Sequence, residues 1–198
     1  YAIGGTAMML QGIKDATLDV DFVFEWQEDR NKFIEALKKL GAKRPDKTLI
    51  YRSKDNVPIV LSLEKAHFDL FLDKIITSVF SKNMKERAKQ IHEFGRNLII
   101  KAADIHDIII MKAVTSRIKD LEDISVIIQK NRINWDIIVE EVKNQLNLGN
   151  ERAILEVGTT FEELNNKNKA IIPKPVLDKI WSLLNRQVKQ VDKNYKKK

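Results

Sequence analysis

Ile3-Gly4-Gly5-Thr6 and, a little further on, Leu18-Asp19-Val20-Asp21-Phe22 are the two pieces of sequence that decide the fold. The two glycines are expected to open a helix, and glycine lets backbone N–H groups approach an anion at a helix start. The second piece reads as a strand. Because side chains alternate along a strand, its two aspartates leave from the same face. The stretch therefore predicts a glycine turn beside a strand that carries two carboxylates.

The front half of the chain alternates predicted strands and helices. Period-two alternation and turn residues predict strands at residues 1–3, 18–26, 49–52, 57–63, 66–72 and 97–101. Apolar residues at helical spacing predict helices at residues 5–13, 29–40 and 75–93. Since the chain starts at Tyr1 within an apparent strand, we expect a further N-terminal segment before it, which in a fold of this type is a helix packed on the sheet.

The back half of the chain is expected to be helical. Asp104 is expected to cap a helix whose stripe runs through Ile105, Ile108, Ile109 and Lys112. Further helices are predicted at residues 120–129, 135–146 and 151–164, and a last one begins near Pro173 and Pro175. The sequence thus predicts an α/β (α+β) fold, with a mixed sheet flanked by helices in residues 1–101 and a helical region in residues 102–198.

Composition sets broad limits on the class of protein. At 198 residues, with 43% hydrophobic and 32% charged residues, the chain suits one domain, or a catalytic domain with a helical extension. It has no cysteine and no apolar run near the roughly 18 residues of a membrane span, and no signal peptide is visible, so we expect a cytoplasmic protein and no membrane partner. A net charge of +7 favours a polyanionic partner such as RNA or a nucleotide, although part of the charge lies in a lysine-rich tail.

Three acids are the candidates for holding a metal. Asp19 and Asp21 form a carboxylate pair of the kind that holds Mg²⁺ or Mn²⁺ with a nucleoside triphosphate (NTP). Asp69, between Phe68 and Leu70 on another predicted strand, would complete one metal site and accept the proton of an attacking hydroxyl. An acid pair alone is more typical of an exposed strand face than of a metal site. The prediction depends on the order and spacing of three motifs together: the Gly4-Gly5 pair, the Asp19–Asp21 pair and Asp69.

The glycine turn is the candidate site for phosphate. Gly4, Gly5 and Thr6 are expected to hold the β- and γ-phosphates through backbone amides and one hydroxyl. A Gly-Gly-Thr sequence by itself predicts no more than a turn.

Together, these motifs resemble the signature of the polymerase-beta-type nucleotidyltransferase superfamily. In that signature an apolar residue, Gly, and Gly or Ser precede an acid-apolar-acid-apolar run, and a separate third acid follows. Gly4-Gly5, Asp19-Val20-Asp21-Phe22 and Phe68-Asp69-Leu70 match these parts in order. The resemblance implies Mg²⁺-dependent transfer of a nucleoside monophosphate from an NTP to a hydroxyl, with release of pyrophosphate.

A second segment resembles a narrower group. Residues 104–113, Arg117 and residues 119–124 are similar to a helix-turn-helix segment of uncharacterised prokaryotic nucleotidyltransferases and of the AbiEii-type toxin group. The resemblance extends from Tyr1 to about Lys130. It implies a toxin-like enzyme that modifies RNA or a protein, with a cognate antitoxin. A small-molecule acceptor and a homodimer stay open as alternatives.

Four residues of this second segment are further site candidates. Lys112 lies on an otherwise apolar stripe, where a buried ammonium without an anionic partner is costly, so we expect it to reach the triphosphate or the carboxylates. The alternative is a lysine that extends to the helix edge. Arg117 is expected to pair with phosphate or with Asp120. Asp120 is expected to be an N-cap with Asp123 in its first turn, and both acids could support Lys112 or Arg117.

A different class of function is also open. The chain could be a nucleotide- or partner-binding module that keeps the fold without turnover. The three intact acids favour the enzyme.

Overall fold

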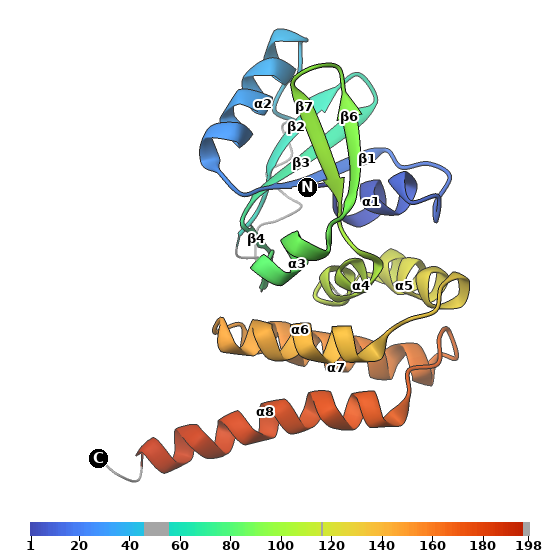
Figure 1. The fold of residues 1–198 in the computed structure, drawn as a ribbon, viewed down its shortest axis with the longest axis vertical. Helices are drawn as coiled ribbons and strands as arrows, with labels where there is room; N and C mark the ends of the chain where they lie inside the picture. Colours follow the sequence, from blue (N-terminus) through green and yellow to red (C-terminus); the bar gives the residue numbers. More distant parts are fainter. Residues whose placement is uncertain (46–55, 116, 196–198) are drawn as a thin grey trace. The chain divides into compact units, whose positions relative to one another are not determined.

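The computed structural model describes residues 1–45, 56–115 and 117–195, with side chains as far as residue 185. The chain divides into two compact units, Tyr1–Met111 and Lys112–Lys198. The first unit is mixed α/β and the second is helical (Figure 1), which confirms the predicted fold class. The division falls inside helix α4 (Ile105–Ala113), whereas the sequence analysis placed the change at residue 101.

The first unit is built on a mixed sheet. Its strands are β1 (Asp19–Phe24), β2 (Ile59–Leu63), β3 (Ala66–Leu72), β4 (Lys74–Ile75) and β5 (Ser78–Val79). Strand β3 lies between β1, which is parallel to it, and β2, which is antiparallel. The predicted strands at residues 18–26, 57–63 and 66–72 are therefore confirmed. The predicted strand at residues 49–52 lies outside the described residues.

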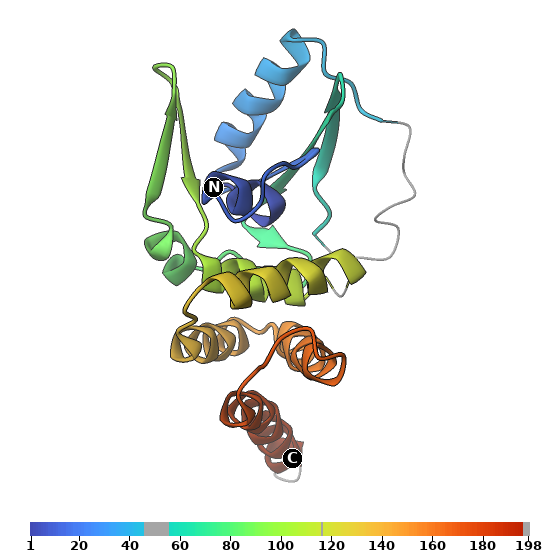
Figure 2. The same ribbon diagram turned by 90° about the vertical axis from the view of Figure 1, so that its right-hand side faces the viewer.

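Helix α2 (Gln27–Lys39) follows β1 in the chain and covers one face of the sheet (Figure 2). Its Phe33 ring lies 5.5 Å from that of Phe22, 5.6 Å from that of Phe24 and 6.4 Å from that of Phe68, between ring centroids. These partners alternate along β1 and β3, so they share one face. The aromatic cluster therefore leaves the intervening side chains, including Asp21 and Asp69, on the opposite face.

The N-terminal segment links this sheet to a separate hairpin. The hairpin consists of β6 (Gln90–Phe94) and β7 (Leu98–Ala102). Ala2 forms an antiparallel bridge to Phe22 and a parallel bridge to Ala102, and its N–H donates to Lys101 O at 2.8 Å. The predicted strand at residues 1–3 is thus an extended segment between β1 and β7. The following helix, α1 (Gly4–Leu10), ends earlier than predicted because Gly12 takes a left-handed φ of 68°.

The predicted helix at residues 75–93 is wrong. The structure has β4, β5, the short helix α3 (Lys82–Arg87) and β6 there. Ser81 caps α3 by accepting a hydrogen bond from Met84 N at 3.2 Å, so the helix cannot begin earlier. Residues 90–94 pair instead with residues 98–102 across a turn at Gly95 (φ 62°). A tertiary partner strand has overridden the local helical spacing.

The second unit contains four complete helices in the described part of the chain. They are α5 (Ile118–Lys130), α6 (Trp135–Asn147), α7 (Glu151–Asn166) and α8 (Lys174–Tyr195). All four helices were predicted, with small differences at their ends. Helices α6, α7 and α8 pack on one another and α5 packs on α7. The core between them buries the apolar side chains of Ile138, Ile154, Phe161 and Ile180.

Two further expectations can be checked against the helices. Asp104 caps α4 as predicted, since its carboxylate accepts a hydrogen bond from His106 N–H at 3.0 Å. None of the described helices combines the length and the apolar character that crossing a membrane requires.

Candidate active site

The register between β1 and β3 brings the predicted acids onto one face. Asp21 lies directly opposite Asp69, and Asp19 lies opposite His67, two positions earlier. Neighbouring strands are about 4.8 Å apart, and side chains two residues apart point the same way. The three carboxylates therefore leave from one small area of the sheet, on the face away from α2.

The start of helix α1 lies against the second of these acids. A Cβ added to Gly4 would lie 2.6 Å from Asp21 Oδ2, a distance that real Cβ atoms do not reach. Gly4 also has a left-handed φ of 54°, which side chains with a Cβ adopt at a cost. Gly4 is therefore required both for its conformation and for the space that the Asp21 carboxylate occupies.

Hydroxyl groups bind the backbone of β1 between the two acids. Thr6 Oγ1 accepts a hydrogen bond from Asp21 N at 2.8 Å and donates one to Asp19 O at 3.2 Å. Thr17 Oγ1 also donates to Asp19 O, at 2.9 Å. The hydroxyl that was expected to hold a phosphate is thus engaged with the strand that carries the acids.

The donor set fits a hard divalent cation that arrives with phosphate. Among the described residues, no group of three or more His, Cys, Asp or Glu side chains is gathered closely enough to hold a metal ion alone. Mg²⁺ commonly binds through one or two carboxylates and completes its shell with water and substrate phosphates. Asp19, Asp21 and Asp69, on one face beside α1, provide donors of that kind.

The second unit gathers the other four predicted residues into one ionic cluster. Lys112 is only 5% exposed, and its Nζ donates to Asp120 Oδ1 at 2.9 Å and to Asp123 Oδ2 at 2.6 Å. Asp120 Oδ2 accepts from Arg117 Nε at 2.6 Å and from the Thr115 hydroxyl. The anionic partner that a buried Lys112 requires is thus supplied by these two acids.

Electrostatics keep the buried acid of this cluster ionised. Burial alone raises the pKa of Asp120, but the charge of Lys112 and hydrogen bonds from Arg117, Thr115 and Lys112 outweigh burial and hold the pKa below its ordinary value of 3.8. Asp120 is therefore held in its ionised form within this cluster.

The predicted N-cap role of Asp120 is wrong. Helix α5 starts at Ile118, and Arg117 occupies the N-cap position without a side-chain cap bond. Asp120 lies inside the first turn, where its carboxylate binds the Lys112 ammonium. The partner of this carboxylate is thus a charge on the preceding helix, α4.

Two threonines that belong to these groups, Thr17 and Thr115, were not predicted from the sequence. Each hydroxyl donates to a predicted acid. Thr17 donates to the backbone carbonyl of Asp19, and Thr115 donates to the carboxylate of Asp120. The only available signal was their position two and five residues before those acids. A threonine at such a distance in a loop is too common to be diagnostic.

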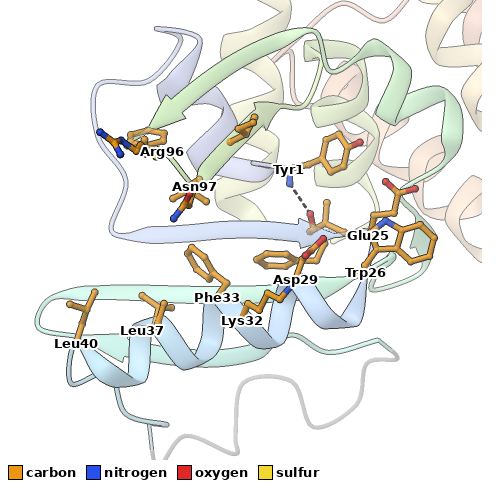
Figure 3. A pocket seen from close by; sticks show the side chains of 16 residues that line it. Tyr1, Glu25, Trp26, Asp29, Lys32, Phe33, Leu37, Leu40, Arg96 and Asn97 are labelled. Carbon is orange, nitrogen blue, oxygen red and sulfur yellow. Dashed lines mark hydrogen bonds between the residues drawn. The ribbon is translucent and has the colours of Figure 1, made fainter.

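A separate groove of about 1080 Å³ lies between α2 and the β6–β7 hairpin (Figure 3). Apolar side chains of Phe33, Leu37 and Leu98 line it, and Tyr1 lies beside it with its amino group donating to Val23 O at 2.8 Å. None of the predicted site residues lines this groove. It is therefore distinct from the carboxylate face.

Most of the chain matches a known protein family. Residues 2–169 match a family described as "Nucleotidyltransferase of unknown function (DUF6036)". The matched range contains every predicted site residue, from Gly4 to Asp123. No curated protein matches the chain.

Proposed function

Because the chain belongs to this family of nucleotidyltransferases of unknown function, we propose that it moves a nucleoside monophosphate from an NTP to a hydroxyl acceptor and releases pyrophosphate. The observation that carries the proposal is the position of Asp21, which lies opposite Asp69 in register and against Gly4 at the start of α1. Nucleotide transfer needs ligands for metal-bound phosphates and a group that activates the acceptor hydroxyl. The carboxylate face offers both kinds of group.

The carboxylates have different roles in this proposal. Asp19 and Asp21 would hold Mg²⁺ or Mn²⁺ together with the triphosphate, and the metal supplies charge neutralisation at the phosphates. Asp69 would hold the same metal and accept the proton of the attacking hydroxyl. Its position on the neighbouring strand, directly across from Asp21, supports a role beside the reacting phosphate.

The nucleotide phosphates would contact backbone and basic groups. N–H groups in the first turn of a helix have no intrahelical acceptor, so those of Gly4, Gly5 and Thr6 are suited to the β- and γ-phosphates. Arg117, whose side chain is half exposed, is a further candidate for binding phosphate, and so is Lys112 of the same ionic cluster. Their bonds to Asp120, and that of Lys112 to Asp123, would orient them.

The acceptor is proposed from charge. A net charge of +7 supports RNA over a neutral small molecule as the acceptor, because a basic surface attracts a polyanion. Modification of RNA fits a toxin-like role controlled by an antitoxin. Growth arrest on expression, relieved by Asp21→Asn, would support that role, and growth without arrest would count against it.

Transfer of label tests the activity itself. The protein would be incubated with each NTP, labelled at the α-phosphate, with Mg²⁺ and total RNA, and pyrophosphate would be measured in parallel. We expect labelled RNA and pyrophosphate with the unchanged protein and neither with Asp19→Asn. The matched control is Asp29→Asn, an exposed acid of α2 outside the carboxylate face. Nucleotide binding without pyrophosphate release would favour a catalytically silent binding module.

A further inference from the structure

The hydroxyl of Thr6 lies between the peptide groups of the two acids on β1. It accepts from Asp21 N at 2.8 Å and donates to Asp19 O at 3.2 Å. On the edge of β1 away from β3, the extended segment at residues 1–3 pairs with β1 through the Ala2–Phe22 bridge, and the Thr6 hydroxyl follows it toward Asp19. The hydroxyl therefore takes the place of a strand partner for these two peptide groups.

This arrangement leaves Thr6 poorly suited to bind phosphate through its side chain. A hydroxyl has one proton to donate, and a phosphate oxygen can only accept. The Thr6 proton is directed at Asp19 O, and the residue is 4% exposed. A phosphate that took this proton would have to displace the bond to the strand and reach a buried group.

The same turn of helix also fixes the side chain of Asp21. Gly4, two residues before Thr6, has its Cα against the Asp21 carboxylate. The peptide of Ile3 adds a further bond, from its N–H to Asp21 O at 3.0 Å. Residues 3–6 thus contact the backbone N–H, the backbone carbonyl and the carboxylate of one aspartate.

We propose that Thr6 is a positioning residue, whose hydroxyl holds the Asp19–Asp21 backbone so that both carboxylates face the nucleotide, and that this hydroxyl is not a ligand of the phosphates. The inference rests on the proposed function, because Thr6 would affect the reaction only through the Asp19 and Asp21 carboxylates. In this proposal the Thr6 side chain and the Thr6 backbone have different roles. The hydroxyl positions β1, and the backbone N–H is the group that would bind phosphate.

Amide exchange and nucleotide binding together test this role. Thr6→Val removes the hydroxyl at nearly constant volume, and Thr6→Ser keeps it. In Thr6→Val the Asp21 amide loses its acceptor, so we expect its hydrogen exchange, measured by NMR, to quicken by about tenfold or more. Thr6→Ser should exchange as the unchanged protein does. Thermal unfolding of both variants shows whether the fold as a whole has changed.

Binding of ATP, GTP, CTP and UTP is then measured by calorimetry in EDTA, where the carboxylates have no metal to share with the phosphates. We expect Thr6→Val to bind within about twofold of the unchanged protein, since no phosphate contact is lost, and label transfer with Mg²⁺ to fall by about tenfold or more. A loss of about tenfold in EDTA would show that the hydroxyl contacts phosphate and would overturn the proposal. An unaltered Asp21 exchange rate in Thr6→Val would overturn it as well.

Failure of the proposed function gives a different result. If the unchanged protein binds none of the four nucleotides, with or without Mg²⁺, the nucleotidyltransferase proposal fails and the positioning role fails with it. If the unchanged protein binds and transfers nucleotide while Thr6→Val also transfers at the full rate, only the positioning role fails.

Discussion

Asp21 and Asp69 lie directly opposite each other on the adjacent parallel strands β1 and β3. This pairing places two acids that are far apart in the sequence on one face of the sheet, away from the aromatic cluster around Phe33. Carboxylate oxygens from neighbouring strands are donors of the kind that a divalent cation binds. The proposal that these carboxylates hold a metal with the nucleotide rests on this pairing.

Asp69→Asn tests the importance of this pair. The amide has nearly the same shape as the carboxylate, so the fold should be kept, but it is a poor proton acceptor and a weaker metal ligand. We expect label transfer from the NTP to fall by about 100-fold or more. The measurement is pyrophosphate release, with Asp29→Asn as the matched acid outside the site. A variant with at least half of the normal rate would remove Asp69 from the site.

Gly4→Ala tests the close approach between α1 and the Asp21 carboxylate. Gly4 and Gly12 both have left-handed φ values, 54° and 68°, but a Cβ meets Asp21 only at Gly4 and meets nothing within 4 Å at Gly12. Gly12→Ala should therefore cost only what alanine pays to adopt a left-handed backbone, about 1 kcal/mol of unfolding free energy. Gly4→Ala should lose more and should also abolish label transfer. Chemical denaturation measures the first effect, and equal losses in the two variants would contradict the contact.

Lys112→Met tests the ionic cluster of the second unit. Lys112 and Asp120 are nearly inaccessible to solvent, at 5% and 1%, so removing the ammonium leaves a buried carboxylate without its main counter-charge. We expect a loss of about 3–5 kcal/mol of unfolding free energy. The control is Lys169→Met, which breaks a partly exposed pair with Glu122 at 3.5 Å and should cost no more than about 1 kcal/mol. Similar losses in the two variants would mean that the cluster is not a stabilising network.

The sequence predicted the parts of the site that depend on local pattern. Alternation along residues 66–72 was sufficient to place β3 and to direct Asp69 to the same face as Asp21. Apolar spacing was also sufficient for helices α5 to α8. These elements are decided by the periodic burial of their own side chains.

Features that depend on a distant partner were not predictable. Residues 90–94 have helical spacing, and only pairing with residues 98–102 makes them a strand. The Thr6 hydroxyl was expected to face phosphate, and its bonds to β1 depend on how the chain between α1 and β1 is folded. Asp120 was expected to cap its own helix, but Lys112 is a stronger partner. In each case the deciding interaction is tertiary, so no local pattern contains it.

Acid titration provides a last test, centred on Asp120. Its pKa in the folded protein lies below 3.8, the ordinary value expected in the unfolded chain, because the Lys112 charge and three hydrogen bonds outweigh the effect of burial. The unfolded state therefore binds the proton first as the pH falls. The stability that comes from this ionised carboxylate is complete above about pH 5 and is lost as the pH falls through about 3.8 toward the folded pKa.

Denaturant unfolding from about pH 6 down to about pH 2 would measure this effect. Asp120→Asn should be less stable than the unchanged protein near neutral pH, because the Lys112 and Arg117 charges lose a partner. Below about pH 4 its unfolding free energy should fall less steeply, since the titrating group is gone. Asp29→Asn, an exposed acid outside the cluster, is the matched control for the loss of one carboxylate. Equal slopes in Asp120→Asn and the unchanged protein would show that Asp120 is not held ionised by its neighbours.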